Sequence, residues 1–164
     1  GGRQAYIYNE LSTDASLIDC EAVRGGSGKI YHYILTTNGS PNDELIQAVM
    51  DKTSSEKKRP LSDTVTVTGG ETLDAKLVIE ITPLASANPQ LVRATAIDQA
   101  NSYAERLKKK LGQDIVPSQI ISELSGDGVW QVKVLSPAQT IIVEPWQLAN
   151  FTDITVTLGD AQDG

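Results

Sequence analysis

The chain has little of the two residue types on which many enzymes and metalloproteins depend. Among 164 residues there is one cysteine, Cys20, and one histidine, His32. Because metal sites rich in histidine or cysteine and nucleophilic triads draw on these residue types, the sequence speaks against both kinds of site. A single cysteine cannot form an intramolecular disulfide, which fits a reducing compartment, and we expect a buried structural thiol.

Aromatic residues and positive charges are also scarce. Aromatic side chains make up 5% of the chain, and 21 acidic residues outnumber 14 basic ones, which gives a formal net charge of -7. We therefore expect cores of Val, Ile, Leu and Ala, and small units built in this way gain stability from a neighbour. The negative charge repels a nucleic-acid backbone on average, so no nucleic-acid partner is expected.

Long hydrophobic runs are absent. No segment approaches the roughly 18 apolar residues of a membrane helix, and no amino-terminal signal peptide is recognisable, so no membrane partner is expected. The chain begins Gly1-Gly2-Arg3 and its sole methionine is Met50, so we expect a fragment of a longer protein.

The first part of the chain has the pattern of two strands and a helix. Residues 15–24 and 29–37 have strand composition, and the glycines between them predict a hairpin. Ser40 as N-cap and Pro41 in the first turn predict a helix that runs to about Glu56.

The second part has alternating strands and a long amphipathic helix. Alternation begins at Asp63. Gly69-Gly70 is compatible with a tight hairpin turn or with a bend where the last strand of one unit continues into the first strand of the next, and we expect the bend. Asn88 as N-cap, an apolar stripe ending at Leu111 and Gly112 as left-handed cap predict the long helix. The remaining predicted elements are a short helix at 118–124 and strands at 129–135, 140–144 and about 154–158.

These elements predict an α+β fold with two small sheet-plus-helix sandwich units and mainly antiparallel mixed sheets. The expected boundaries are 1–62 for the first unit, 63–158 for the second and 159–164 for a frayed tail.

Motifs that could carry chemistry are incomplete. In Gly25–Lys29 a phosphate loop would need a glycine where Val23 stands and a hydroxyl where Ile30 stands, so we expect a hairpin turn. We expect His32 at a sheet surface without a ligand role. The carboxylates are scattered; a small hydrolase would need a cluster of them with raised pKa values in a cleft.

Charged and aromatic side chains offer candidates for contacts. Lys108–Lys110 predicts a solvated helix end first and a contact for an acidic partner second. Trp130 fits the inward alternation of its strand and is predicted in the core. Trp146, with Phe151 close by, is predicted to be an anchor that packs either within the chain or at a protein interface.

Several motifs follow one another in a distinctive order: AYIYNELSTDASLIDCEAV, SPNDELIQAV, RPLSDTVTV, LGQDIVPSQIISEL and GDGVWQVKVLSP. This order resembles the baseplate J-like proteins of contractile phage tails, and the resemblance covers roughly residues 5–158. It implies a non-enzymatic wedge component of a virion tail baseplate, assembled in the host cytoplasm with other wedge proteins and copies of itself. No cofactor, catalytic residue, metal ligand or small-molecule substrate comes with the resemblance.

Two points stay open in the sequence. The resemblance implies that the family's amino-terminal domain is not part of this fragment, which leaves self-assembly of the fragment open. The alternative function is an independent surface binding or adhesion module, which would need an exposed apolar groove, whereas a wedge protein needs a broad flat contact.

Overall fold

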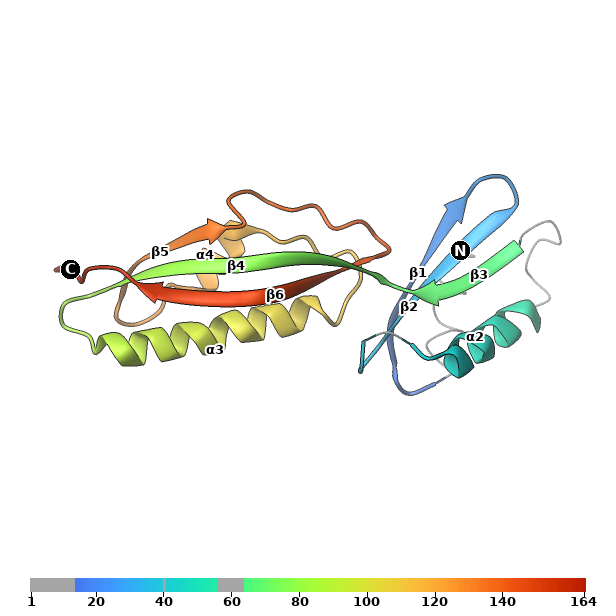
Figure 1. Ribbon diagram of the computed structural model, residues 1–164, viewed down its shortest axis with the longest axis horizontal. Coiled ribbons are helices and arrows are strands. Elements are labelled where there is room, and N and C mark those ends of the chain that lie inside the picture. Colours follow the sequence, from blue (N-terminus) through green and yellow to red (C-terminus); the bar gives the residue numbers. More distant parts are fainter. Residues whose placement is uncertain (1–13, 40, 56–63) are drawn as a thin grey trace. The chain divides into compact units, whose positions relative to one another are not determined.

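The computed structural model describes residues 14–39, 41–55 and 64–164, which form two compact units (Figure 1). Unit 1 comprises Gly1–Thr72, Lys108–Gly112 and Glu144–Leu148. Unit 2 comprises Leu73–Leu107, Gln113–Val143 and Ala149–Gly164. The predicted division into two α+β units is therefore present, with short segments of the later sequence built into unit 1.

Unit 1 contains a three-stranded sheet in the order β1-β2-β3. Strands β1 (Leu17–Gly25) and β2 (Lys29–Thr36) form the predicted antiparallel hairpin, and β3 (Thr64–Gly69) lies parallel to β2. Because β3 pairs with β2, it belongs to the first sheet, although the expected boundary at 62 placed it in the second unit.

Helix α2 (Asp43–Ser55) packs against this sheet (Figure 1). Its N-cap is Asn42, whose Oδ1 accepts a hydrogen bond from Leu45 N at 2.8 Å, so the helix begins later than predicted. The predicted cap, Ser40, lies outside the described residues. Val49 on α2 is fully buried in an aliphatic cluster with Ile30 and Ile34 of β2.

A second cluster in unit 1 joins residues far apart in the sequence. Leu35 packs with Leu111 and Leu148, and Leu111 N donates a hydrogen bond of 2.8 Å to Asp19 Oδ2. The long helix was predicted to reach Leu111 but ends at Leu107; Leu111 is buried in this cluster instead. Gly112 has the predicted left-handed backbone, with φ +74°.

Unit 2 contains a three-stranded sheet in the order β5-β4-β6. The central strand is β4 (Glu71–Pro83), to which β5 (Val129–Ser136) is antiparallel. Strand β6 (Gln147–Leu158) runs parallel to β4, and its direction is continued by a parallel bridge between Leu84 and Gln162. Each of the two sheets thus combines one antiparallel pair with one parallel pair, and mixed sheets were predicted.

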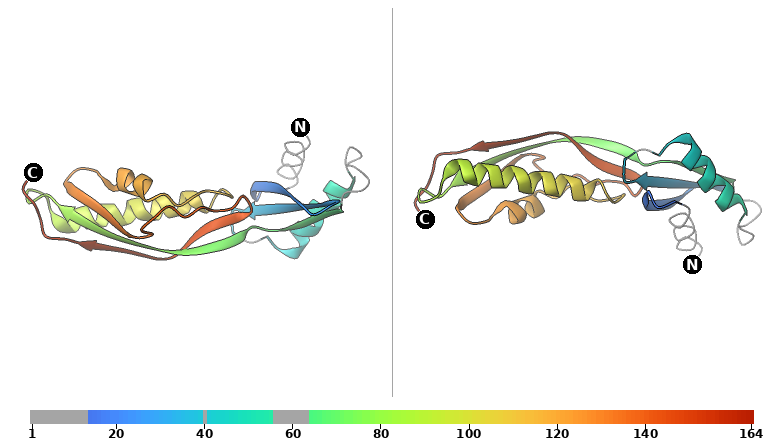
Figure 2. Two further views of the ribbon diagram at one scale, coloured as in Figure 1. Left: turned by 90° about the horizontal axis from the view of Figure 1, so that it is seen from above. Right: turned by 90° about the horizontal axis from the view of Figure 1, so that it is seen from below.

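Two helices, α3 (Pro89–Leu107) and α4 (Pro117–Leu124), cover the same face of the sheet of unit 2 (Figure 2). Asn88 caps α3 as predicted, since its Oδ1 accepts hydrogen bonds from Gln90 N at 3.0 Å and Leu91 N at 3.3 Å. The predicted stripe of α3 is buried at Val92, Ala96, Ala100, Tyr103 and Leu107. It packs in one core with the inward side chains of β4, of which Leu77, Ile79 and Ile81 are fully buried.

The prediction that Trp130 lies in the core is wrong, because β5 does not alternate regularly. Its pairing with β4 shifts register twice, and Trp130 and Leu135 are the extra residues. The bulge at Trp130 breaks the alternation, so Trp130 is 49% exposed although it has the same parity as the buried Val132, whereas the 54% exposure of Leu135 follows the alternation from Val132.

The carboxy-terminal part of the chain differs from the sequence prediction in two more ways. The predicted strand at 140–144 is reduced to an isolated bridge between Ile115 and Ile141. The tail was expected to fray, but Gly159 N donates to Ile81 O at 2.8 Å and Gln162 N donates to Pro83 O at 3.0 Å. The tail is therefore bonded alongside β4. At Gly69-Gly70 the predicted passage from one sheet into the next is confirmed, since β3 and β4 lie in different sheets.

Candidate functional site

The two aromatic residues predicted as a contact site lie in different units and are both used within the chain. Trp146 is half-buried in unit 1, with its ring centroid 6.3 Å from that of Tyr33. Phe151 is 8% exposed in the core of unit 2, where its ring centroid lies 6.2 Å from that of Tyr103. Of the pair, Trp146 keeps the larger accessible fraction.

His32 and Cys20 are buried in unit 1. The expectation of a sheet surface for His32 is wrong: its side chain is fully buried on the strand face that carries Ile30 and Ile34. Burial, with a smaller contribution from the charge of Asp19, raises the pKa of the Cys20 thiol to about 12. Cys20 is therefore a thiol at neutral pH, as expected of a structural cysteine.

Residues 14–39, 41–55 and 64–164 contain no group of three or more His, Cys, Asp or Glu side chains placed to hold a metal ion. Residues Gly25–Lys29 form the predicted hairpin turn, in which Lys29 N donates to Gly26 O at 3.2 Å. Among the helices in the described part of the chain, none combines the length and the apolar character that crossing a bilayer requires.

The basic side chains at the end of α3 are of two kinds: one forms an ion pair with α4, and others are exposed to solvent. Both terminal nitrogens of the Arg106 guanidinium group, Nη1 and Nη2, donate to the carboxylate of Glu123 on α4, at 2.6 and 2.7 Å. Lys109 and Lys110 beyond the helix are exposed, as the solvated helix end was predicted to be.

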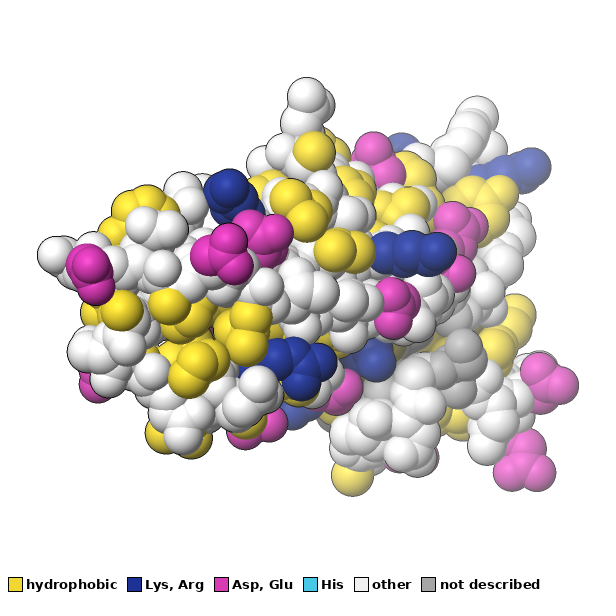
Figure 3. All heavy atoms as spheres, turned by 60° about the vertical axis from the view of Figure 1, so that its left-hand side comes forward, with side chains coloured by type: hydrophobic (Ala, Val, Ile, Leu, Met, Phe, Trp, Pro, Cys, Tyr) yellow, Lys and Arg dark blue, Asp and Glu magenta, His cyan; other side chains and the backbone are white. Residues whose placement is uncertain are grey.

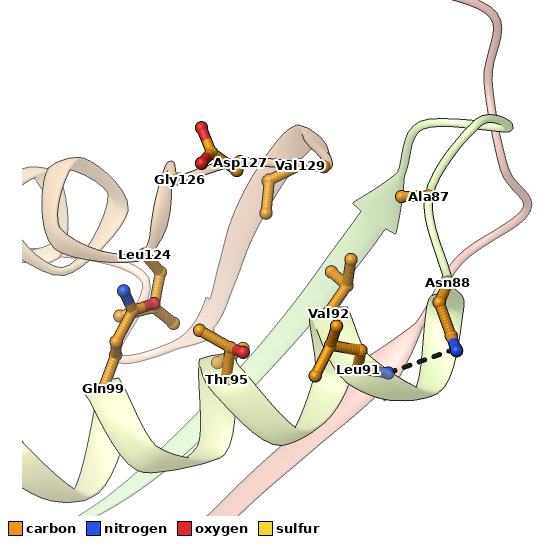
Figure 4. A pocket seen from close by; sticks show the side chains of 12 residues that line it. Ala87, Asn88, Leu91, Val92, Thr95, Gln99, Leu124, Gly126, Asp127 and Val129 are labelled. Atoms are coloured by element: carbon orange, nitrogen blue, oxygen red, sulfur yellow. Dashed lines mark hydrogen bonds between the residues drawn. The ribbon is translucent and has the colours of Figure 1, made fainter.

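Unit 2 carries a groove between the first half of α3 and the loop that joins α4 to β5 (Figure 4). Its volume is about 560 Å³, within the range of a few hundred to about 1,000 Å³ typical of ligand pockets. The apolar lining residues are Ala87, Leu91, Val92, Ala96, Leu124 and Val129, and the polar ones are Asn88, Thr95, Gln99 and Asp127.

Gly128 allows the loop wall of the groove to approach α3. Its φ is +78°, and an added Cβ would lie 3.0 Å from Ala87 Cβ and 3.1 Å from Val92 Cγ2. A side chain here would meet both backbone strain and crowding. Asp127 is the one carboxylate among the lining residues, so the groove does not assemble the acid pair of a glycosidase.

Sequence reasoning did not find this groove. Its walls come from segments about 30 residues apart, and the local signals predict only a helix start and a turn. One signal was present: Leu91 lies off the buried stripe of α3 and is 66% exposed. A large aliphatic side chain on the outer side of a helix suggests a contact that the unit itself does not supply.

The elements described define an α+β fold with a groove in unit 2. Residues 75–157 match the family model described as Baseplate J-like protein C-terminal domain, and the chain belongs to this family. The predicted resemblance is thereby confirmed. The chain is 24% identical over 165 residues to "Baseplate protein J" of Escherichia phage P2, an alignment that covers 99% of this chain and 54% of that protein.

The fold is also similar to a chain in the cryo-EM structure of the anti-feeding prophage baseplate, 6-fold symmetrised. The TM-score is 0.63 at 8% sequence identity, and the match covers 90% of this chain and 36% of that one. At this identity the match shows a shared fold. The chain thus spans about half the length of the phage P2 protein and about a third of the solved chain.

Proposed function

We propose that the chain is a structural part of a baseplate wedge in a contractile tail, where it assembles with other wedge proteins and with copies of itself. The observation that carries the proposal is family membership, together with an alignment to a phage baseplate protein that covers 99% of this chain. In this role the protein resides in the virion tail baseplate after assembly in the host cytoplasm, and it catalyses no reaction.

The physical character of the two units supports an assembling role. Their cores are aliphatic and small, and partner contacts stabilise units of this kind. Unit 2 exposes Leu91, Ile142 and Leu135 by more than half of each side chain, at 66%, 63% and 54%. Contacts with other proteins would bury such surface. With a net charge of -7, nucleic acid is not among the proposed partners, and neither are membranes or small-molecule substrates.

Trp146 remains the proposed aromatic contact residue, because half-burial leaves part of its ring accessible. Phe151 was predicted beside it, but its burial against Tyr103 leaves little surface for a partner. We therefore do not assign Phe151 a direct contact.

A deletion and complementation experiment tests the proposed function. The gene for the full-length protein is deleted from the genome that encodes the particle, and particles are examined by negative-stain electron microscopy. We expect tails without complete baseplates, and recovery of sheathed, contractile particles when the full-length protein is supplied in trans. Intact contractile particles in the deletion strain would refute an assembly role.

The groove of unit 2 favours one alternative, a surface binding or adhesion module, because such a module needs an apolar recess. The same deletion distinguishes the two functions. An adhesion module predicts structurally complete particles that fail to adsorb to cells, whereas a wedge component predicts incomplete particles.

A further inference from the structure

The groove of unit 2 is bordered by an unusually exposed aliphatic side chain. Leu91 is 66% exposed at its rim, and Val92, Ala96 and Leu124 line it from below as buried members of the core. Hydrophobic side chains gather at this end of unit 2 in the space-filling view (Figure 3). The close-up shows Leu91 and Val92 on α3 facing the loop that carries Asp127 (Figure 4). The groove thus combines an apolar floor with an open apolar edge.

The walls of the groove are fixed by hydrogen bonds. The α4–β5 loop is held by Leu84 N, which donates to Gly128 O at 2.8 Å, and by Val129 N, which donates to Gly126 O at 3.2 Å. The opposite wall begins at Asn88, which caps α3. Because both walls are bonded in place, little ordering is needed when a ligand binds, and less of the binding free energy is lost.

The residues that line the groove carry charge of one sign. Asp127 is exposed among the lining residues, which include no Lys or Arg. The nearest arginine along α3, Arg93, donates its Nε to Val156 O of β6 at 3.0 Å. Asp160 and Asp163 are exposed in the tail segment that is bonded beside Leu84. A partner segment with basic side chains is therefore complementary to the groove, whereas a segment of a second copy of this chain, whose net charge is -7, is on average a less complementary occupant of the groove.

We propose that this groove docks a segment of a neighbouring baseplate protein in which aliphatic side chains are flanked by Lys or Arg. The aliphatic side chains would pack on Leu91, Val92 and Val129, and a basic side chain would pair with Asp127. Aliphatic anchors in a preformed groove with charged residues at the rim are a common mode of peptide recognition. This proposal rests on the proposed wedge function, because that function identifies the partner as another baseplate protein.

The binding test uses NMR of the ¹⁵N-labelled chain and a short acetylated peptide with two leucines flanked by lysines. Two control peptides replace either the leucines by serine or the lysines by glutamate. We expect amide shift changes at Leu91, Thr95 and residues 126–129 with the first peptide, and at least about 10-fold weaker binding of both controls. Equal binding of either control peptide, or shifts confined to other surfaces, would overturn the proposal.

Matched variants locate the site. Leu91→Ser and Asp127→Lys alter exposed side chains and should weaken peptide binding by about 10-fold or more. Their controls, Leu135→Ser and Asp153→Lys, are also at exposed positions but outside the groove, and they should bind as the unaltered chain does. Unchanged binding by Leu91→Ser with a folded amide spectrum would refute the groove as the site. Amide shifts at the groove that depend on protein concentration without peptide would assign it to a second copy.

The two proposals fail in different ways. If deletion of the full-length gene leaves baseplates intact, the wedge function is wrong whatever the peptide does. If the full-length protein restores particles while the peptide fails to bind, the wedge function stands and the groove assignment is wrong.

Discussion

Phe151 and Trp130 differ in burial in a way that the sequence did not predict, and paired alanine substitutions test this difference. Phe151, named with Trp146 as a candidate contact, is 8% exposed, whereas Trp130, predicted in the core, is 49% exposed. Both lie in unit 2, so the two substitutions perturb the same folded unit. The larger side chain should therefore contribute less to stability than the smaller one.

The magnitudes follow from burial. Phe151→Ala removes a ring from the core, which typically costs about 3–5 kcal/mol, including the cavity and the lost contact with Tyr103. Trp130 has about half of its surface in water already, and solvent fills the space left by truncation. Full burial of a large apolar side chain contributes about 1.5–3 kcal/mol, so Trp130→Ala should cost about 1 kcal/mol.

Urea unfolding followed by far-UV circular dichroism measures both changes. With a slope of about 2 kcal/mol per molar urea, Phe151→Ala should lower the midpoint of unit 2 by about 1.5–2.5 M and Trp130→Ala by about 0.5 M. The chain has two tryptophans, so the fluorescence of Trp146 reports on unit 1 alone in the Trp130→Ala variant and, for Phe151→Ala, in a Trp130→Phe background, and it serves as an internal control. A larger midpoint shift for Trp130→Ala than for Phe151→Ala would refute the bulged register of β5.

Two further predictions concern local features. Asn88→Ala removes the cap of α3 and should destabilise unit 2 by about 1 kcal/mol in the same urea assay. The control is Asn101→Ala, at an exposed position inside α3, which should be neutral or slightly stabilising. An equal loss of unfolding free energy in Asn88→Ala and Asn101→Ala would argue against the capping role of Asn88. Because burial raises the pKa of Cys20 to about 12, the folded chain should react with a thiol reagent at pH 8 far more slowly than the chain in urea, whose thiol pKa lies near 9.0. Equal labelling rates would show that Cys20 is accessible and ionised in the folded state.

Helix α3 was predictable because its signals are local. The cap at Asn88 and the buried stripe from Val92 to Leu107 lie within one stretch of sequence and depend on no partner strand. The stripe also continues in phase to Leu111, yet that residue packs with Leu35 and Leu148 in unit 1. Periodicity predicted burial of Leu111 but could not identify the cluster that buries it.

Strand β5 shows why the rest of the fold could not be predicted. Whether Trp130 faces inward depends on its register with β4, some 50 residues earlier, and a bulge at Trp130 itself changes the phase of the alternation there. His32 is a different case, since it alternates in phase with Ile30 and Ile34, both buried. The alternation alone indicates that His32 is buried with Ile30 and Ile34. The surface location was predicted because the His32 side chain is polar.

The groove was beyond sequence reasoning for a related reason. Its lining joins α3 to the α4–β5 loop, and the close approach depends on the left-handed backbone of Gly128. A Gly-Asp-Gly sequence predicts a turn and says nothing about which helix the turn will face. The exposed Leu91 marks the position only once the stripe of α3 is known to lie elsewhere.

The surfaces of unit 2 differ in how well they suit an apolar contact with a partner. The side that carries the helices suits such a contact best. Strand β5 is an edge strand interrupted by two bulges and carries the exposed Lys133, features that hinder pairing with another strand. The face of β4 turned away from the helices carries the polar side chains of Asp74, Lys76 and Glu80. A partner that buries apolar surface therefore gains most at the groove beside α3, where an apolar floor and an exposed leucine lie together. If partners instead used the sheet edge, substitution of Lys133 would alter assembly more than substitution of Leu91, and the ranking of these surfaces would be reversed.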